Sequence, residues 1–453
     1  MIIGASQYDN VESNEGSAFV YHGSASGVNS GTAGTPANAS WTGEANQATA
    51  NYGFGVACAG DVNGDGYSDI IIGSPLYDNG ESNEGMAFVY HGSASGVNSG
   101  TAGTPLNAAW TGEGNQLSAN FSYGAVASAG DVNGDGYSDV IVGAYLYDGG
   151  LADEGAVYVY HGSAIGVNGG TAGTPANAAW TGEPNQASAQ YGFSVACAGD
   201  VNGDGYSDVI VGAIQYDNGQ SNEGGAFVFH GSATGVNAGI AGTPANAAWT
   251  GESNQASANY GLSVASAGDV NGDGYADVVI GAPVYNNGSA VEGMAYVYQG
   301  SASGVNGGTA GTPVNAAWAG EPNVTNTQFG RCVASAGDVN GDGYSDIIVG
   351  AHQYDNGQTD EGGAFVYHGS PNGVNNGTAG TPLNSNWTVE SNQVSASFGI
   401  SVSTAGDVNG DGYSDVIVGA DLYDNGSADE GGAFVYHGSA TGLSTTANWT
   451  VES

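Results

Sequence analysis

The stretch that decides the fold of this chain is Asp61-Val62-Asn63-Gly64-Asp65-Gly66-Tyr67-Ser68-Asp69. It returns almost unchanged at 131–139, 200–208, 269–277, 338–346 and 407–415. Successive copies begin 70, 69, 69, 69 and 69 residues apart. A fixed period is typical of repeat architectures, so the 453 residues are predicted to form one repeat domain, 1–453, and not several unrelated ones.

Oxygen-bearing residues occupy alternate positions of this loop: Asp61, Asn63, Asp65 and Asp69 offer side-chain oxygens, and Tyr67 offers a backbone carbonyl. Ca²⁺ takes six to eight oxygen ligands at about 2.3–2.6 Å, and alternate residues of a tight loop can point at one ion. The twelfth position, where an EF-hand has a bidentate glutamate, is an isoleucine, so the loop is not an EF-hand. The alternative is an acidic turn without an ion, in which three carboxylates within nine residues repel one another.

The sequence therefore predicts about six Ca²⁺ ions, one in each loop. The same five positions supply the ligands in every copy. They are Asp61, Asn63, Asp65, Tyr67, Asp69; Asp131, Asn133, Asp135, Tyr137, Asp139; Asp200, Asn202, Asp204, Tyr206, Asp208; Asp269, Asn271, Asp273, Tyr275, Asp277; Asp338, Asn340, Asp342, Tyr344, Asp346; and Asp407, Asn409, Asp411, Tyr413, Asp415.

The charge balance excludes several classes of partner. The chain has 44 acidic residues, no lysine, and Arg331 as its only basic side chain. Nucleic acid and anionic membrane surfaces both need clustered Lys and Arg, so neither is expected to bind. No apolar run approaches 18 residues, and direct membrane insertion is not expected either. Cys58, Cys197 and Cys332 are too few for a disulfide framework and are predicted to be small, buried strand residues.

One unit contains four short apolar stretches separated by turn-forming segments. They are Tyr52–Ala59, Ile70–Ile72, Met86–Gly92 and Ala109–Gly112. The β-branched run of the second is typical of a strand buried on both faces, and no segment has a helical period. Four antiparallel strands repeated around an axis are the pattern of a β-propeller blade, so the predicted class is all-β.

Counting these segments predicts a seven-bladed β-propeller of four-stranded antiparallel blades, the first of them incomplete. The blades are expected at about 1–50, 51–121, 122–189, 190–258, 259–327, 328–396 and 397–453. Met1–Ala5 matches the middle of a unit, so the first blade lacks its first strand and its acidic loop. An unpaired inner edge predicts either a gap in the ring or strand exchange with a neighbouring chain.

The units resemble FG-GAP repeats, the building blocks of the integrin α-subunit propeller. The FG pair is present as Tyr52-Gly53, Tyr123-Gly124, Tyr191-Gly192, Tyr260-Gly261, Phe329-Gly330 and Phe398-Gly399. The GAP element is complete at Gly281-Ala282-Pro283 and is reduced elsewhere. The resemblance covers essentially the whole chain and implies a seven-bladed ring, with calcium in the loop that joins the first two strands of a blade. Integrin-specific ligand binding is not implied, because nothing here matches its recognition loops.

Two aromatic columns recur in all seven units. One tryptophan per unit could stack on sugar rings or act as a wedge between blades. Repeated sugar pockets would gain avidity, so Trp110, Trp180, Trp249 and Trp318 are candidate ligand contacts, with inter-blade packing as the alternative. The second column consists of Tyr8, Tyr77, Tyr147, Tyr216, Tyr285, Tyr354 and Tyr423, and it could equally cover a blade edge.

The function predicted from the sequence is a calcium-binding extracellular recognition or adhesion propeller, secreted or at a cell surface. Its ligand would be an unidentified glycan or protein, and a lectin is the sharper form of this hypothesis. The alternative is a non-binding structural repeat module, natural or engineered, of a larger cell-surface or secreted protein. No enzyme is expected, because Arg331, His352 and Asp421, which depart most from their columns, belong to different units and form no motif.

Overall fold

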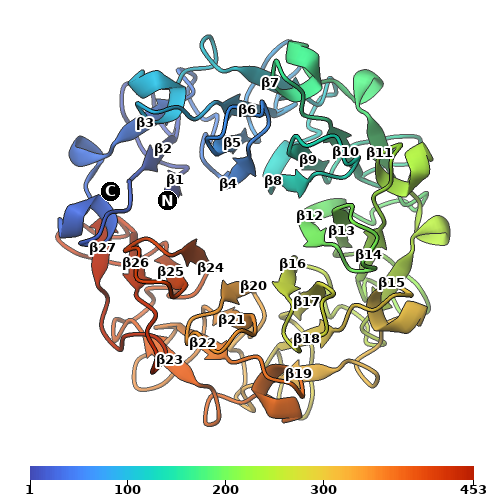
Figure 1. The fold of residues 1–453 in the computed structure, drawn as a ribbon, viewed down its shortest axis with the longest axis vertical. Helices are drawn as coiled ribbons and strands as arrows, with labels where there is room; N and C mark the ends of the chain where they lie inside the picture. The colour runs from blue at the N-terminus through green and yellow to red at the C-terminus, as the bar shows by residue number, and fades with distance from the viewer. Residues whose placement is uncertain (453) are drawn as a thin grey trace.

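The computed structural model describes residues 1–452 and forms a closed ring of seven β-sheets around a central channel (Figure 1). Six sheets have four antiparallel strands, and the first has three. The described residues contain no α-helix, only one-turn 3-10 segments in the connections. The predicted all-β, seven-bladed propeller with an incomplete first blade is therefore confirmed.

The strands follow one order in every blade, from the channel outward. Blade 1 has β1 (Ile2–Ala5), β2 (Ser17–Val20) and β3 (Trp41–Glu44); blade 2 has β4 (Gly55–Gly60), β5 (Asp69–Ser74), β6 (Met86–Tyr90) and β7 (Trp110–Glu113); blade 3 has β8 (Phe121–Gly130), β9 (Asp139–Ala144), β10 (Ala156–Tyr160) and β11 (Trp180–Gly182); blade 4 has β12 (Tyr191–Gly199), β13 (Asp208–Ala213), β14 (Gly225–Phe229) and β15 (Trp249–Glu252). Blade 5 has β16 (Ser263–Gly268), β17 (Asp277–Ala282), β18 (Met294–Tyr298) and β19 (Trp318–Gly320); blade 6 has β20 (Cys332–Gly337), β21 (Asp346–Ala351), β22 (Gly363–Tyr367) and β23 (Trp387–Glu390); blade 7 has β24 (Ser401–Gly406), β25 (Asp415–Ala420), β26 (Gly432–Tyr436) and β27 (Trp449–Glu452). The 3-10 segments are η1 (Val28–Gly31), η2 (Pro36–Asn38), η3 (Val97–Gly100), η4 (Val167–Gly170), η5 (Pro175–Asn177), η6 (Val236–Gly239), η7 (Pro244–Asn246), η8 (Val305–Gly308) and η9 (Val374–Gly377).

The burial of each strand follows its composition. The second strands of blades 2–6, such as β5 and β9, are buried at every position, as expected for continuous β-branched runs covered on both faces. The fourth strands alternate, with Trp110 and Gly112 buried in β7 and the residues between and after them partly exposed. In β4–β5, Val56 pairs with Ile72, and a bulge before Gly60 leads into the acidic loop. The strand pattern thus places each loop at the end of a rigid hairpin.

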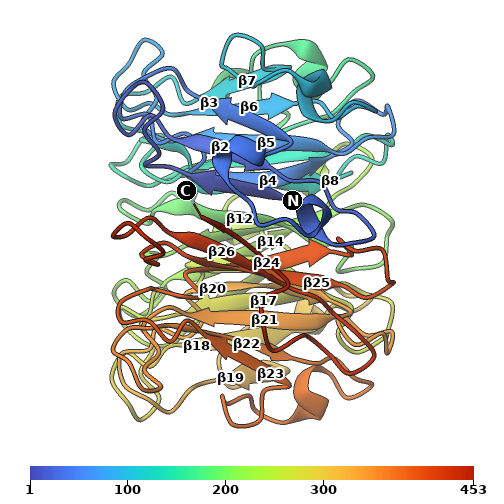
Figure 2. The same ribbon diagram turned by 90° about the vertical axis from the view of Figure 1, so that its left-hand side faces the viewer.

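The hydrophobic core lies between blades. One cluster joins Val62 and Trp110 of blade 2 to Phe121, Val140 and Tyr160 of blade 3, and equivalent clusters repeat around the ring. The last blade closes on the first by the same contacts: Gly34 N donates to Thr450 O at 2.8 Å and Trp449 Nε1 donates to Thr32 O. Figure 2 shows the disc edge-on, with the connections gathered on its two faces.

The FG pair predicted in the third unit is wrong by two residues. Phe121, and not Tyr123, is the fully buried aromatic residue, and its backbone N–H donates to Glu84 O at 2.9 Å. Ser122 takes the place of the glycine at φ 73°, with its hydroxyl donating to Met86 O at 2.6 Å. Gly124 follows as an added residue in a register shift of β8, which explains why this one repeat is 70 residues long.

The three cysteines are more exposed than the sequence predicted. Cys58, predicted to be buried, is exposed, because β4 borders the incomplete first blade; Cys197 and Cys332 are partly exposed. None of the helical segments in residues 1–452 has the length and hydropathy of a membrane span.

Candidate metal centres and rim pockets

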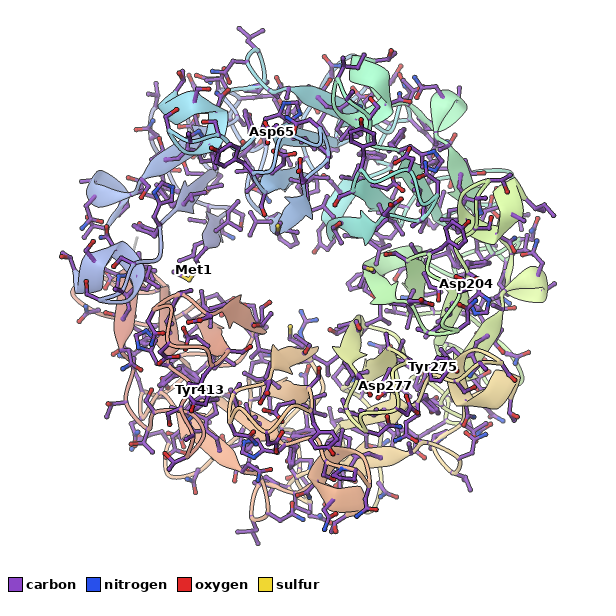
Figure 3. All side chains as sticks on the ribbon, viewed as in Figure 1. Met1, Asp65, Asp204, Tyr275, Asp277 and Tyr413 are labelled. Atoms are coloured by element: carbon purple, nitrogen blue, oxygen red, sulfur yellow. The ribbon has the colours of Figure 1, made fainter. Side chains whose placement is uncertain are left out.

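The six acidic loops each connect the first and second strands of blades 2–7. Figure 3 shows Asp65, Asp204 and Tyr413, which belong to three of these loops, in three blades around the ring. All thirty predicted ligand residues lie in these loops or at the first residue of the second strand. The residues predicted as ligands therefore lie together in the same hairpin loop of each of these six blades.

The first half of each loop is a tight turn in which side-chain oxygens face the loop's own backbone. Asp61 accepts hydrogen bonds from Asp65 N at 3.1 Å and from Gly66 N at 2.8 Å. Asp65 in turn accepts from Tyr67 N at 3.0 Å. Gly64 and Gly66 have φ values of 71° and 87°, which L side chains rarely adopt. The glycines thus allow the carboxylates to point inward from alternate positions.

The last aspartate fixes the loop to the sheet. Asp69 is fully buried and accepts from Val62 N at 2.8 Å and from Gly92 N, at the end of β6, at 2.6 Å. Burial raises the pKa of its equivalents Asp139, Asp208, Asp277 and Asp346 to about 7; backbone N–H groups oppose the rise, and neighbouring carboxylates add to it. These carboxyls therefore lie in a setting that penalises negative charge unless a cation is near.

The chemistry of the donor set fits a hard divalent cation. Among residues 1–452, no group of three Asp, Glu, His or Cys side chains is arranged to hold a metal ion. In the loops, the carboxylates instead accept hydrogen bonds from backbone amides. Each carboxylate oxygen that accepts one N–H keeps a further lone pair. Arg331, the one Lys or Arg side chain, stands just before β20 and outside the loops. His161, His230 and His368 lie beside three of the loops, and burial lowers the pKa of each ring, which favours its neutral form. The loops thus offer ordered oxygens with no Lys or Arg among them.

Neighbouring loops are joined across the blade boundaries. Ser138 N donates to Asp61 O at 3.0 Å, and the same bond recurs at the next four boundaries, up to Ser414 N to Asp338 O at 2.9 Å. The ring of Tyr137 lies against Gly64, so close that a Cβ there would stand 2.7 Å from it. The loops therefore form one continuous chain from blade 2 to blade 7, an arrangement that repeat spacing alone did not reveal.

The candidate ligand role of Trp110, Trp180, Trp249 and Trp318 is corrected by their burial. Their side chains are only 2–3% exposed, and each ring packs against an aromatic ring of the next blade at 5.0–5.1 Å. The indole N–H of Trp249 donates to Thr309 O at 2.9 Å. A sugar would need an exposed ring face, so these residues are inter-blade wedges.

The tyrosine column lines shallow pockets at the outer rim instead. Tyr285, Asn287 and Glu321 border a pocket of about 320 Å³, and Asn287 Nδ2 donates to Glu321 Oε2 at 2.5 Å. The equivalent residues of blade 4, Tyr216, Asn218 and Glu252, border a pocket of about 270 Å³. Here "rim pockets" denotes these two sites. In several blades an Asn and a Glu 34 residues further along the chain form this pair, and that recurring spacing is the sequence signal that could have identified the rim pockets.

The residues that depart from the repeat lie near one another after all. Arg331 and His352 belong to blade 6 and Asp421 follows β25 of blade 7, yet the charge of Arg331 acts on both of the others. His352 Nδ1 is buried and has no hydrogen-bond partner among residues 1–452. The expectation that all three belong to different units is wrong for Arg331 and His352, which share blade 6, and the three side chains form a local electrostatic cluster.

We expect His352 to make the protein sensitive to acid. Burial, and secondarily the Arg331 guanidinium, lower the pKa of His352 to about 4, below its usual value of about 6.5. The folded state therefore favours the neutral ring; this stability is complete above pH ~6.5 and is lost as the pH falls toward ~4. The shift corresponds to at most roughly 3 kcal/mol, which partial solvation reduces to about 1–2 kcal/mol.

Urea unfolding of His352→Ile between pH 7 and 4 tests this prediction. Ile214 occupies the same position in blade 4, so the substitution suits the fold. The variant should lose less free energy of unfolding on acidification than the unmodified protein, whereas His22→Gln, at an exposed position, should not differ from it. An unchanged pH slope in His352→Ile would contradict the assignment.

Comparison with known proteins gives matches in blades 2–7. The family model described as FG-GAP repeat matches residues 55–90, 123–160, 192–229, 260–298, 332–367 and 398–436. Integrin alpha-5 of Xenopus laevis is 29% identical over 239 residues, which cover 51% of this chain and 20% of that protein. Integrin alpha-6 of Homo sapiens is 42% identical over 120 residues, which cover 26% and 9%. The chain thus spans about a fifth or less of the length of these relatives.

Among solved structures, the rhamnogalacturonan lyase YesW has a TM-score of 0.33 and 12% sequence identity, with 87% of this chain and 68% of that one covered. A similarity of this size has no bearing on function.

Proposed function

The chain belongs to the FG-GAP repeat family, and from this premise we propose that it is a calcium-binding recognition or adhesion propeller of an extracellular protein, secreted or displayed at a cell surface. The integrin alpha relatives support the recognition role, although they match over only a small part of their own length. We propose no catalytic activity for it.

The observation that carries the proposal is the set of six linked loops with ordered oxygen donors and no Lys or Arg among them. In the loop of blade 4, Asp200, Asn202, Asp204, the Tyr206 carbonyl and Asp208 would hold the ion, and the other five loops would do the same. A bound Ca²⁺ would neutralise the clustered carboxylates. Extracellular calcium modules bind at roughly 10⁻⁴–10⁻³ M, which suits secreted fluids and not the cytosol.

The rim pockets support a glycan as the ligand class. A sugar ring presents an apolar face for Tyr285 or Tyr216, and hydroxyl groups for the Asn and Glu beside them. One pocket of this size would bind weakly, but equivalent positions recur around the ring, and several weak contacts on one surface gain avidity. The two pockets lie in adjacent blades, which suits a branched or repeating glycan.

A glycan array probed with calcium-loaded protein tests the proposed function. We expect binding that saturates, is inhibited by the free sugar, and falls in the double variant Glu252→Gln, Glu321→Gln. A matched control, Glu12→Gln, alters an exposed acidic residue away from both pockets. Failure to bind any glycan would contradict the lectin form of the proposal, and would favour a protein ligand or a structural spacer.

A further inference from the structure

The ring has a discontinuity between the loops of blades 7 and 2. At every other boundary a glycine of one loop is covered by a tyrosine of the next: a Cβ on Gly341 would lie 2.5 Å from the Tyr413 ring. A Cβ on Gly410, the equivalent glycine of blade 7, would meet nothing within 4 Å. Figure 1 shows β4, β8, β12, β16, β20 and β24 beside the channel, while the first blade reaches it only with β1. Within residues 1–452, blade 1 therefore has one strand and one loop fewer than each of the other six blades.

Apolar side chains on the blade 7 side of this discontinuity are more exposed than their counterparts. Ala405, Val408, Ile417 and Phe434 are partly exposed. The same columns in blade 6 are Ala336, Val339, Ile348 and Phe365, and all four are fully buried. In blade 6 the first three of these positions pack against the first strand and neighbouring elements of blade 7, whereas Phe365 belongs to the cluster shared with blade 5. Blade 7 thus exposes apolar positions that, in the other blades, are covered by the first strand of the next blade.

The strand edge of blade 1 and the first strand of blade 2 also lack the neighbours that their equivalents have in the other blades. β1 pairs only with β2, so the edge that pairs with a first strand in the other blades is free. On the blade 2 side, Cys58 is exposed and the Tyr67 side chain is 43% exposed, whereas its equivalents lie over the preceding loop. Figure 3 places Met1 beside the channel at this point of the ring. Here "inner gap" denotes the space bounded by Gly410, Gly419, the free edge of β1 and Tyr67.

We propose that the inner gap is a β-augmentation site that binds an extended peptide segment of the same type as the first strand and acidic loop of this repeat. The occupant would have an aromatic-Gly pair, then alternating small residues and a buried valine, then the Asp-rich turn. This composition follows from the ring itself, since segments of that kind fill the six equivalent positions. Edge strands commonly recruit a peptide by backbone hydrogen bonds, and side-chain pockets then select its sequence.

The register of the docked segment follows from the complete blades. In β4–β5, Val56 pairs with Ile72 and Gly55 with Gly73. The corresponding residues of β1 are Ile3 and Gly4, so the valine of the guest would lie opposite Ile3. The aromatic-Gly pair would then reach Gly419, just as the carbonyl of Gly399 lies 2.0 Å from a Cβ built on Gly350. Only a glycine at position 419 leaves room for that carbonyl.

The probe is a synthetic peptide with the sequence of residues 259–277, labelled with a fluorophore and titrated with the intact protein in millimolar Ca²⁺ and again in EDTA. Anisotropy should show saturable binding of one peptide per chain, and the melting temperature of the complex should exceed that of the free protein. Strand pairing does not require the metal, so binding of a second peptide of residues 259–268, which lacks the loop, should persist in EDTA at temperatures below the melting temperature of the EDTA-treated protein. Its persistence would support this proposal even if the loops bound no calcium.

Two controls make the result specific to the inner gap. In the free protein, the Cβ of Gly419→Ala meets only the flexible Ser401 hydroxyl, so the variant should fold but bind the peptide at least about tenfold more weakly. A peptide in which the residue equivalent to Val264 is lysine should bind the unmodified protein at least about tenfold more weakly, because that valine is buried in the complete blade. No saturable binding, or equal affinity across these variants, would overturn the proposal.

Discussion

Chelation of divalent cations with EDTA should lower the melting temperature of this protein by far more than any single substitution in a loop. Each loop places three carboxylates within nine residues, and one of them is buried. A site at 100 times its dissociation constant adds about 2.7 kcal/mol to stability. Six such sites, linked by backbone hydrogen bonds from blade to blade, would dominate a net stability of about 5–15 kcal/mol.

Differential scanning calorimetry in EDTA, and then in millimolar Ca²⁺ or Mg²⁺, measures this effect. Calcium should restore the original melting temperature, and Mg²⁺ should restore less, because it demands a smaller octahedral site. The single variant Asp204→Ala, in calcium, should shift the transition by only a fraction of the EDTA effect. A melting temperature that does not depend on calcium would mean that the loops are only turns.

Replacement of Trp249 by alanine should destabilise the ring by about 3–5 kcal/mol, the usual cost of truncating a buried tryptophan. The ring of Trp249 is 5.0 Å from that of Tyr298 in the next blade, and it lies against the backbone of Gly311. The substitution also removes the hydrogen bond from the indole N–H to Thr309 O, which then keeps, among residues 1–452, only the Asn306 side-chain amide as a donor. Both the cavity and the lost hydrogen bond lie at the boundary between two blades, and cooperative unfolding of the ring depends on the contacts between its blades.

Urea unfolding followed by circular dichroism compares Trp249→Ala with Thr250→Ala. Thr250 is the next residue of β15 and is partly exposed, so its substitution should cost no more than about 1 kcal/mol. Equal losses in the two variants would indicate that the tryptophan column does not hold the blades together. A pure ligand-binding role for the tryptophans would predict that outcome.

The architecture followed from the sequence because each level of it repeats. The acidic loop fixed the period, and the β-branched run around Ile71 and the regular tryptophan fixed the strand order and the blade count. The missing first strand of blade 1 was equally visible, because Met1–Ala5 aligns with a second strand. These conclusions rest on pattern alone and need no side-chain geometry.

Contacts between blades could not be obtained in this way. The sequence spacing shows that Trp110 and Trp249 occupy the same position in their repeats. It does not show whether their rings face solvent or the next blade, which the burial of the rings reveals. The substitution of Phe121-Ser122 for an FG pair was hidden by the more obvious Tyr123-Gly124, and only burial identified the aromatic residue that packs. The bonds between loops, and the grouping of Arg331 with side chains of two blades, likewise depend on distances around the ring.

The measurement that tests the central claim most directly is a count of bound calcium. Protein stripped with EDTA, dialysed against Ca²⁺ and analysed by atomic emission against protein concentration should hold about six ions per chain, one per loop. Asp204→Ala should hold one ion fewer, while Asp9→Asn, an exposed acidic position outside the loops, should keep the full number. A count near zero, or one that Asp204→Ala leaves unchanged, would contradict the assignment of these loops as calcium sites.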